Sequence, residues 1–78
     1  MLSAKELQNI NVETLEEGRE FLETISQRIK EILEQMRKPI VNTEWSKLNN
    51  EGYELKKARR HIQQQMGKIV AQRRKSHV

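Results

Sequence analysis

The 78-residue sequence predicts an all-α fold, an antiparallel helical hairpin of two long helices with a short N-terminal helix. Apolar residues recur at gaps of three and four along two long segments, which is the spacing of one helix face. All 11 acidic residues are glutamate, which helix interiors tolerate better than aspartate. The short connection from Lys38 to Asn42 favours antiparallel neighbours. Residues 1–78 are therefore interpreted as a single helical domain.

The first helix is expected over residues 3–9. Ser3 and Glu6 have the spacing of a capping box, in which side chains satisfy backbone amides of the first turn. Leu7 contributes to a modest apolar edge. Asn9 favours a cap or turn, so the helix is expected to end there.

The second helix is expected over residues 14–37. Thr14 and Glu17 repeat the capping-box spacing, and Pro39 restricts Lys38 to extended conformations that end the helix. Between these limits an apolar seam recurs with heptad spacing, which predicts coiled-coil-like packing. The seam comprises Leu15, Gly18, Leu22, Ile25, Ile29, Ile32 and Met36, with Phe21 and Leu33 beside it.

The third helix is expected over residues 42–74, followed by a tail at 75–78. Its apolar stripe keeps its phase across residues 49–52, although Asn-Asn-Glu-Gly has the composition of a turn. One continuous helix is therefore favoured, and two helices separated by a break at 49–52 are the alternative. Trp45, at the start of the apolar stripe, is expected to cap the core near Met36.

The third helix is longer than the second, so its last turns are expected to overhang. The N-terminal segment is expected to cover part of that overhang. The widened seam and the apolar residues of the overhang predict association with a second copy, as a dimeric bundle, or with a helical partner. Gly18 and Gly52 lie at seam positions, where glycine is a tolerated weakness, a mark of close helix approach or a slot for a bulky side chain of a partner.

Charge divides the chain into two halves. Residues 12–36 hold seven glutamates against three basic residues, and residues 37–78 hold eleven basic residues against three glutamates. An acidic helix beside a basic helix predicts complementary flanks within the hairpin. The remaining positive charge predicts a basic outer surface on the third helix at about 100° per residue. That candidate surface consists of Lys56, Lys57, Arg60, Lys68, Arg74 and Lys75.

Several chemistries lack the residues that they need. The chain has no cysteine, no aspartate and only two histidines, so a thiolate nucleophile, a cysteine zinc site and a Ser-His-Asp triad are excluded. We expect no enzyme activity, no cofactor and no small-molecule substrate. No stretch approaches the ~18 apolar residues of a membrane span, and residues 1–10 lack the apolar run of a signal peptide. A cytoplasmic protein is the expectation.

The expected function is a non-enzymatic protein-binding or assembly module, a small adaptor or regulator. It would pack its hairpin against itself, as a homodimer, or against a helical protein partner. The candidate contacts are Tyr53, beside the weak stretch of the third helix, and Ile69 and Val70 on the overhang. The alternative is a small basic regulator that binds DNA or RNA through the outer face of the C-terminal helix. A third and weaker alternative is a basic amphipathic helix on an acidic membrane surface.

Overall fold

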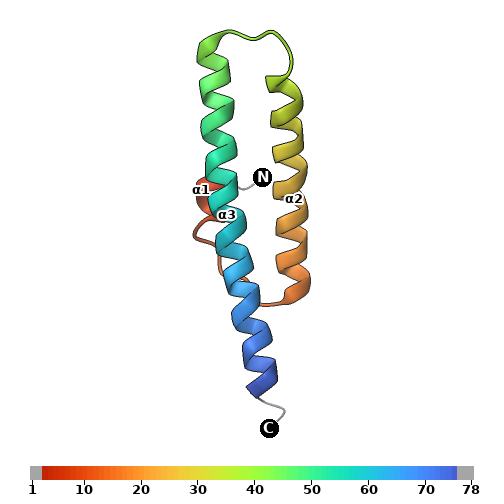
Figure 1. The fold of residues 1–78 in the computed structure, drawn as a ribbon. Helices are drawn as coiled ribbons and strands as arrows, with labels where there is room; N and C mark the ends of the chain where they lie inside the picture. Colours follow the sequence, from red (N-terminus) through yellow and green to blue (C-terminus); the bar gives the residue numbers. More distant parts are fainter. Residues whose placement is uncertain (1–2, 76–78) are drawn as a thin grey trace.

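The computed structural model describes residues 3–75, which form three helices: α1 (Ala4–Leu7), α2 (Leu15–Met36) and α3 (Asn42–Lys75). α2 and α3 pack antiparallel as a hairpin, and α1 lies alongside α3 (Figure 1). The molecule is a rod of 57 × 18 × 18 Å. The expected helical hairpin with a short N-terminal helix is thus confirmed. No helix within residues 3–75 has both the length and the apolarity needed to cross a membrane.

Both expected capping residues begin their helices. The hydroxyl of Ser3 accepts a hydrogen bond from the backbone N–H of Glu6 at 3.3 Å, and that of Thr14 accepts from Glu17 at 3.1 Å. α1 ends at Leu7, earlier than expected. There the side-chain amide of Asn9 donates to the carbonyl of Lys5 at 3.1 Å, and such local bonds compete with helix continuation.

α3 runs without interruption through residues 49–52, which is the alternative that the sequence favoured. No glycine in the described part of the chain has a positive φ, so Gly52 keeps a helical backbone. Contacts with α2 support this stretch. Nη2 of Arg28 donates to Oε1 of Glu51 at 3.0 Å, and Gly52 faces Ile32. Tertiary contacts therefore override the turn-like composition.

The N-terminal segment, α2 and α3 all contribute residues to the buried core. It consists of Leu7, Val12, Ile25, Ile32, Leu55, Ala58 and Ile62. Ile25 and Ile32 are 0% and 2% exposed, so the predicted seam does form the inward face of α2, whereas Ile29 is only partly buried. The expectation for Trp45 is wrong. Its side chain is 44% exposed, because α2 ends before the level of the first turn of α3 (Figure 1).

Residues 8–13, here called the N-terminal strap, run along α3 and are bonded to it at three points. Nε2 of Gln8 donates to the carbonyl of Glu54 at 3.1 Å, Nε2 of His61 lies 2.8 Å from the carbonyl of Ile10, and the N–H of Val12 donates to Oε1 of Gln65 at 2.6 Å. Two extended residues span about 6.6 Å and four helical residues about 6 Å, so Ile10 and Val12 meet successive turns of α3 at His61 and Gln65. Beyond the strap, α3 extends past the start of α2, as expected (Figure 1).

Candidate protein-binding groove

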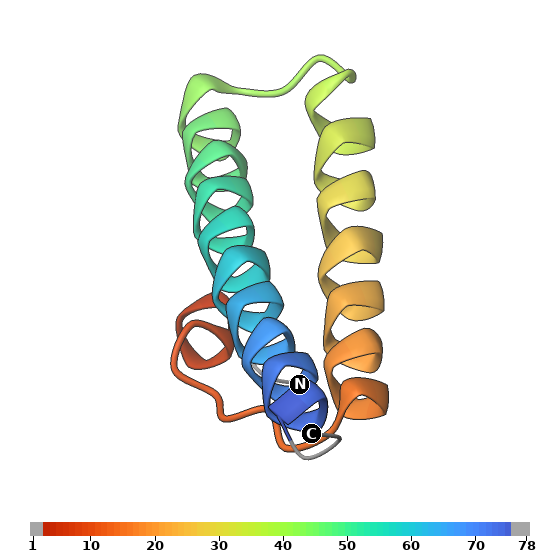
Figure 2. The same ribbon diagram turned by 60° about the horizontal axis from the view of Figure 1, so that its bottom comes forward.

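Two helices packed side by side leave a groove on each face of the hairpin. On one face, α1 and the N-terminal strap cover α3, where Leu7 and Val12 enter the core (Figure 2). The groove on the other face, here called the open groove, is lined by residues of α2 and α3 alone. These are Ile29, Ile32, Leu33, Met36, Leu48, Asn49, Asn50, Gly52, Tyr53 and Lys56. The N-terminal segment leaves this groove uncovered.

The floor of the open groove is apolar. Ile32 is buried at the bottom, and Met36 and Leu48 are half-buried beside it. Gly52 contributes no side chain, and a Cβ built there would lie 4.0 Å from Cγ2 of Ile32. Leu33 stands on the edge of the groove with 55% of its surface exposed. An exposed leucine beside a recessed apolar floor suits a surface that another chain covers.

The groove narrows toward the other end of the hairpin, where α2 and α3 approach closely. A Cβ built on Gly18 would lie 2.6 Å from Cγ and 2.7 Å from Sδ of Met66, which is too close for any side chain larger than hydrogen. The geometry therefore supports close helix approach at Gly18. At Gly52 the spacing is ordinary, so this glycine deepens the groove and does not bring the helices together.

Arg59, which is not among the residues predicted from the sequence, occupies a seam position of α3. It lies seven residues from both Gly52 and Met66, which face α2, so it points to the same side of α3. Its side chain is partly buried. Within the described part of the chain its guanidinium has neither a hydrogen bond nor an ion pair. The feature of the sequence that could have identified Arg59 is its spacing of seven residues from both Gly52 and Met66.

The edges of the open groove are basic. Lys56 is the charged residue among those that line it, and Arg60 follows one turn later. On the α2 edge, helical spacing places two exposed cations near Leu33: Lys30 and Arg37. The next acidic residues around α2, Glu23 and Glu34, lie beyond Lys30 toward the outer face. The groove thus combines an apolar floor with positive edges.

The residues predicted from the sequence as partner contacts lie in different places. Tyr53 lines the open groove and is 61% exposed. Ile69 is partly buried and packs against the core, whereas Val70, the next residue, is 36% exposed. Only Tyr53 therefore belongs to the open groove, and the structure does not bring the three residues together.

The predicted basic surface extends around more than one side of α3. Lys56 lines the open groove, whereas Lys57 is turned outward, with its Nζ 4.6 Å from the ring centroid of Tyr53 and 3.9 Å from Oε1 of Glu54. Arg60, Lys68 and Arg74 are exposed, and the side chain of Lys75 lies outside the described residues. Among the described residues, Lys56, Arg60 and Lys68 have no carboxylate partner.

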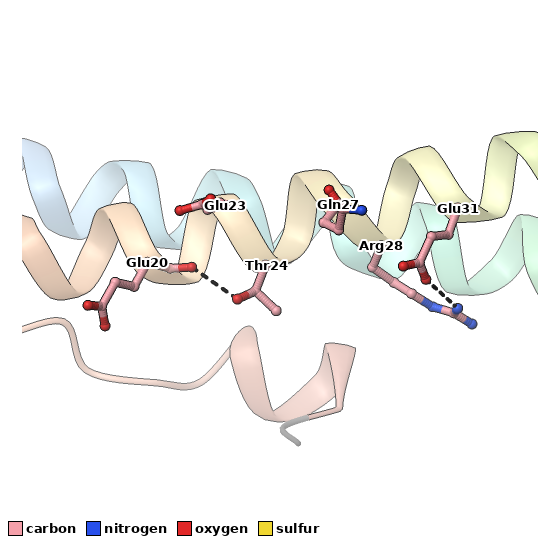
Figure 3. Close-up of a pocket in the computed structure, with 6 residues that line it drawn as sticks. All are labelled: Glu20, Glu23, Thr24, Gln27, Arg28 and Glu31. Carbon is pink, nitrogen blue, oxygen red and sulfur yellow. Dashed lines mark hydrogen bonds and ion pairs between the residues drawn. The ribbon is translucent and has the colours of Figure 1, made fainter.

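Several acidic residues of α2 are turned away from α3, so these do not contribute to the expected complementary flanks. Three glutamates line a shallow hollow on the outer side of α2 with Thr24, Gln27 and Arg28, and they are Glu20, Glu23 and Glu31 (Figure 3). One ion pair between the two long helices has the opposite sense, since Arg28 comes from the acidic helix and Glu51 from the basic one. These three glutamates therefore lie away from the open groove, whose charged lining residue is Lys56.

The Arg28–Glu51 pair shifts the titration of both groups. The hydrogen bonds that Arg28 donates lower the pKa of Glu51 below its usual range, with burial opposing the shift. The same bonds raise the pKa of Arg28, which Glu31 also contacts at 3.2 Å. The pair lies beside Leu55 on the face that carries α1, away from the open groove, so it supports the hairpin.

Comparison of the chain with models of known protein families, with curated proteins and with solved structures found no match.

Proposed function

We propose that this protein is a non-enzymatic protein-binding module, a small adaptor or regulator, whose open groove seats a helix from another chain. One observation carries the proposal. The N-terminal segment packs against α3 on one face of the hairpin, and the groove on the other face keeps an apolar floor with Leu33 exposed at its edge. In helix-in-groove recognition, apolar side chains at i, i+3, i+4 and i+7 enter such a floor. The other chain is either a second copy, forming a homodimeric bundle with coiled-coil-like packing, or a helical partner protein.

Trp45 provides a reporter for this proposal. It is the one tryptophan of the chain, it is 44% exposed, and it lies one turn before Leu48 of the groove floor. A helix seated in the groove should therefore change its emission. The probe for a foreign helix is a synthetic amphipathic peptide that carries a leucine stripe with glutamine flanks and no tryptophan. Sedimentation velocity over about a hundredfold range of protein concentration detects a second copy.

Leu33→Glu should abolish either association, because it places a charge at the edge of the apolar floor. Gln27→Glu is the matched control, since it makes the same charge change on the outer side of α2. A monomer at every concentration, together with Trp45 emission that the peptide does not change, would refute the proposed function.

DNA or RNA binding is a second candidate function, favoured by the unpaired cations Lys56, Arg60 and Lys68 on α3. Each neutralised phosphate contributes about 0.7–0.9 to the slope of log affinity against log salt. Replacing Lys56, Arg60 and Arg74 with glutamine should then lower the slope by about two to three and weaken binding to any sequence. The absence of a salt-sensitive submicromolar complex with duplex DNA or structured RNA would remove this candidate.

A further inference from the structure

We infer that the occupant of the open groove is an acidic amphipathic helix of a different protein, selected by Arg59 together with Lys56 and Arg60. This inference rests on the proposed function and specifies its partner. An amphipathic helix would direct apolar side chains onto Ile32, Met36 and Leu48. Glutamate or aspartate on its flank would meet the positive edge that α3 provides.

Arg59 is the residue that carries this inference furthest. It lies midway between Gly52 and Met66 on the face of α3 that packs against α2, and both of these residues contact α2. Helix pairs ordinarily have apolar residues at such positions. Its partial burial costs hydration, and no carboxylate in the described chain compensates its charge. By contrast, Arg28 on the covered face has bonds to both Glu51 and Glu31. A carboxylate of the partner would pair with the guanidinium of Arg59, as Glu51 pairs with that of Arg28.

A second copy of the chain is a poor match for the open groove. Two copies docked groove to groove would set Lys56, Arg59 and Arg60 of each against basic edges of the other, and like charges at an interface oppose association. Glutamates of α2 do not relieve this repulsion, because none is among the residues that line the open groove, and Glu20, Glu23 and Glu31 line a hollow elsewhere on the helix (Figure 3).

Nucleic acid and lipid also suit the groove less well. A phosphate backbone needs cations but has no use for an apolar floor. A lipid surface is met by apolar side chains that project outward, whereas Ile32 is 2% exposed and recessed between two helices. On the opposite face the N-terminal segment already packs against α3 and adds Leu7 and Val12 to the core, so this hairpin can bury a further stretch of chain.

Three synthetic peptides test the inference with the full chain. They share one length and one leucine stripe, and their flanking positions carry glutamate, glutamine or lysine. Binding is followed by Trp45 emission and by anisotropy of labelled peptide. The glutamate peptide should bind most tightly and the lysine peptide roughly tenfold or more weakly, with a gap that narrows as salt is added.

Variants of α3 then locate the selectivity. Lys56→Glu combined with Arg60→Glu should reverse the peptide order, since both residues are exposed and the fold does not depend on them. Lys57→Glu combined with Lys68→Glu, an equal charge change on the outer side of α3, should leave the order unchanged. Arg59→Gln should weaken binding of the glutamate peptide and leave binding of the glutamine peptide intact, which also shows that the variant folds.

The outcomes separate the inference from the proposed function. Equal affinity for the three peptides would overturn the inference and leave the proposed function standing, whereas no binding of any peptide and no self-association would refute both. Equal effects of the two double variants would overturn the inference, since net charge would then explain the preference. A dimer that excludes the peptides would make a second copy the occupant, and displacement of the glutamate peptide by duplex DNA would favour nucleic acid; either result overturns the inference.

Discussion

Replacing glycine with alanine should stabilise the protein at Gly52 and Gly67 and destabilise it at Gly18, although the chemical change is the same. All three lie inside helices, where alanine is favoured over glycine by about 1 kcal/mol. At Gly67 no atom lies within 4 Å of the new Cβ, and at Gly52 the nearest is Cγ2 of Ile32 at 4.0 Å. Both substitutions should therefore raise the free energy of unfolding by about 1 kcal/mol.

At Gly18 the same gain is outweighed by steric overlap. The new Cβ would lie 2.6 Å from Cγ of Met66 and 3.2 Å from Cγ1 of Val12. Overpacking of this kind costs about 1–3 kcal/mol, and Cγ is too near the backbone of Met66 to move aside freely. Gly18→Ala should therefore lose about 1 kcal/mol net.

Thermal melts followed by circular dichroism can compare the three variants. A difference of about 2 kcal/mol between Gly67→Ala and Gly18→Ala corresponds to roughly 8–16 °C in Tm for a chain of this size. Gly18→Ala combined with Met66→Ala should recover part of the loss as a coupling energy. If Gly18→Ala raised Tm as Gly67→Ala does, the close approach of α2 and α3 at this point would be refuted.

Three further predictions concern the core, the ion pair and the strap. Ile25→Ala should cost about 2–5 kcal/mol, because Ile25 is 0% exposed, and should exceed the cost of Ile29→Ala in urea melts; equal costs would place the wrong residue at the centre of the core. Glu51→Gln should cost about 1 kcal/mol at pH 7. Because the pKa of Glu51 is lowered, this difference should be full above about pH 4.3 and vanish as the pH falls through the folded-state value; a pH-independent difference would contradict the pairing. Gln65→Ala should cost about 1 kcal/mol and speed hydrogen exchange at the Val12 amide, whereas its exposed neighbour Gln64→Ala should do neither; unchanged exchange in both would show that the strap is held elsewhere.

Periodicity and capping chemistry predicted the helices well because both are local properties. Ser3 and Thr14 accept the hydrogen bonds that their spacing implies, and the phase of the apolar stripe correctly favoured a continuous α3. The boundary of α1 was less predictable, because it depends on whether the Asn9 amide reaches a carbonyl one turn back.

The candidate site depended on the rotation and register of α2 against α3, which no local pattern specifies. The charge pattern predicted complementary flanks, yet Glu20, Glu23 and Glu31 of α2 line a hollow turned away from α3, and Arg28 pairs with Glu51 in the reverse sense. Arg59 resembles any surface arginine in the sequence. Its position becomes apparent only when Gly52 and Met66 are both seen to face α2.

Amide chemical-shift mapping of the full chain with the glutamate-flanked peptide tests most directly whether the open groove receives a helix. The largest shifts should fall on the two lining segments, Ile29 to Met36 and Leu48 to Lys56, and on Arg59, while the strap residues Ile10 and Val12 should remain unchanged. Shifts centred on the strap, shifts confined to the outer side of α3 around Lys57 and Lys68, or no shifts at all would contradict the assignment of this groove.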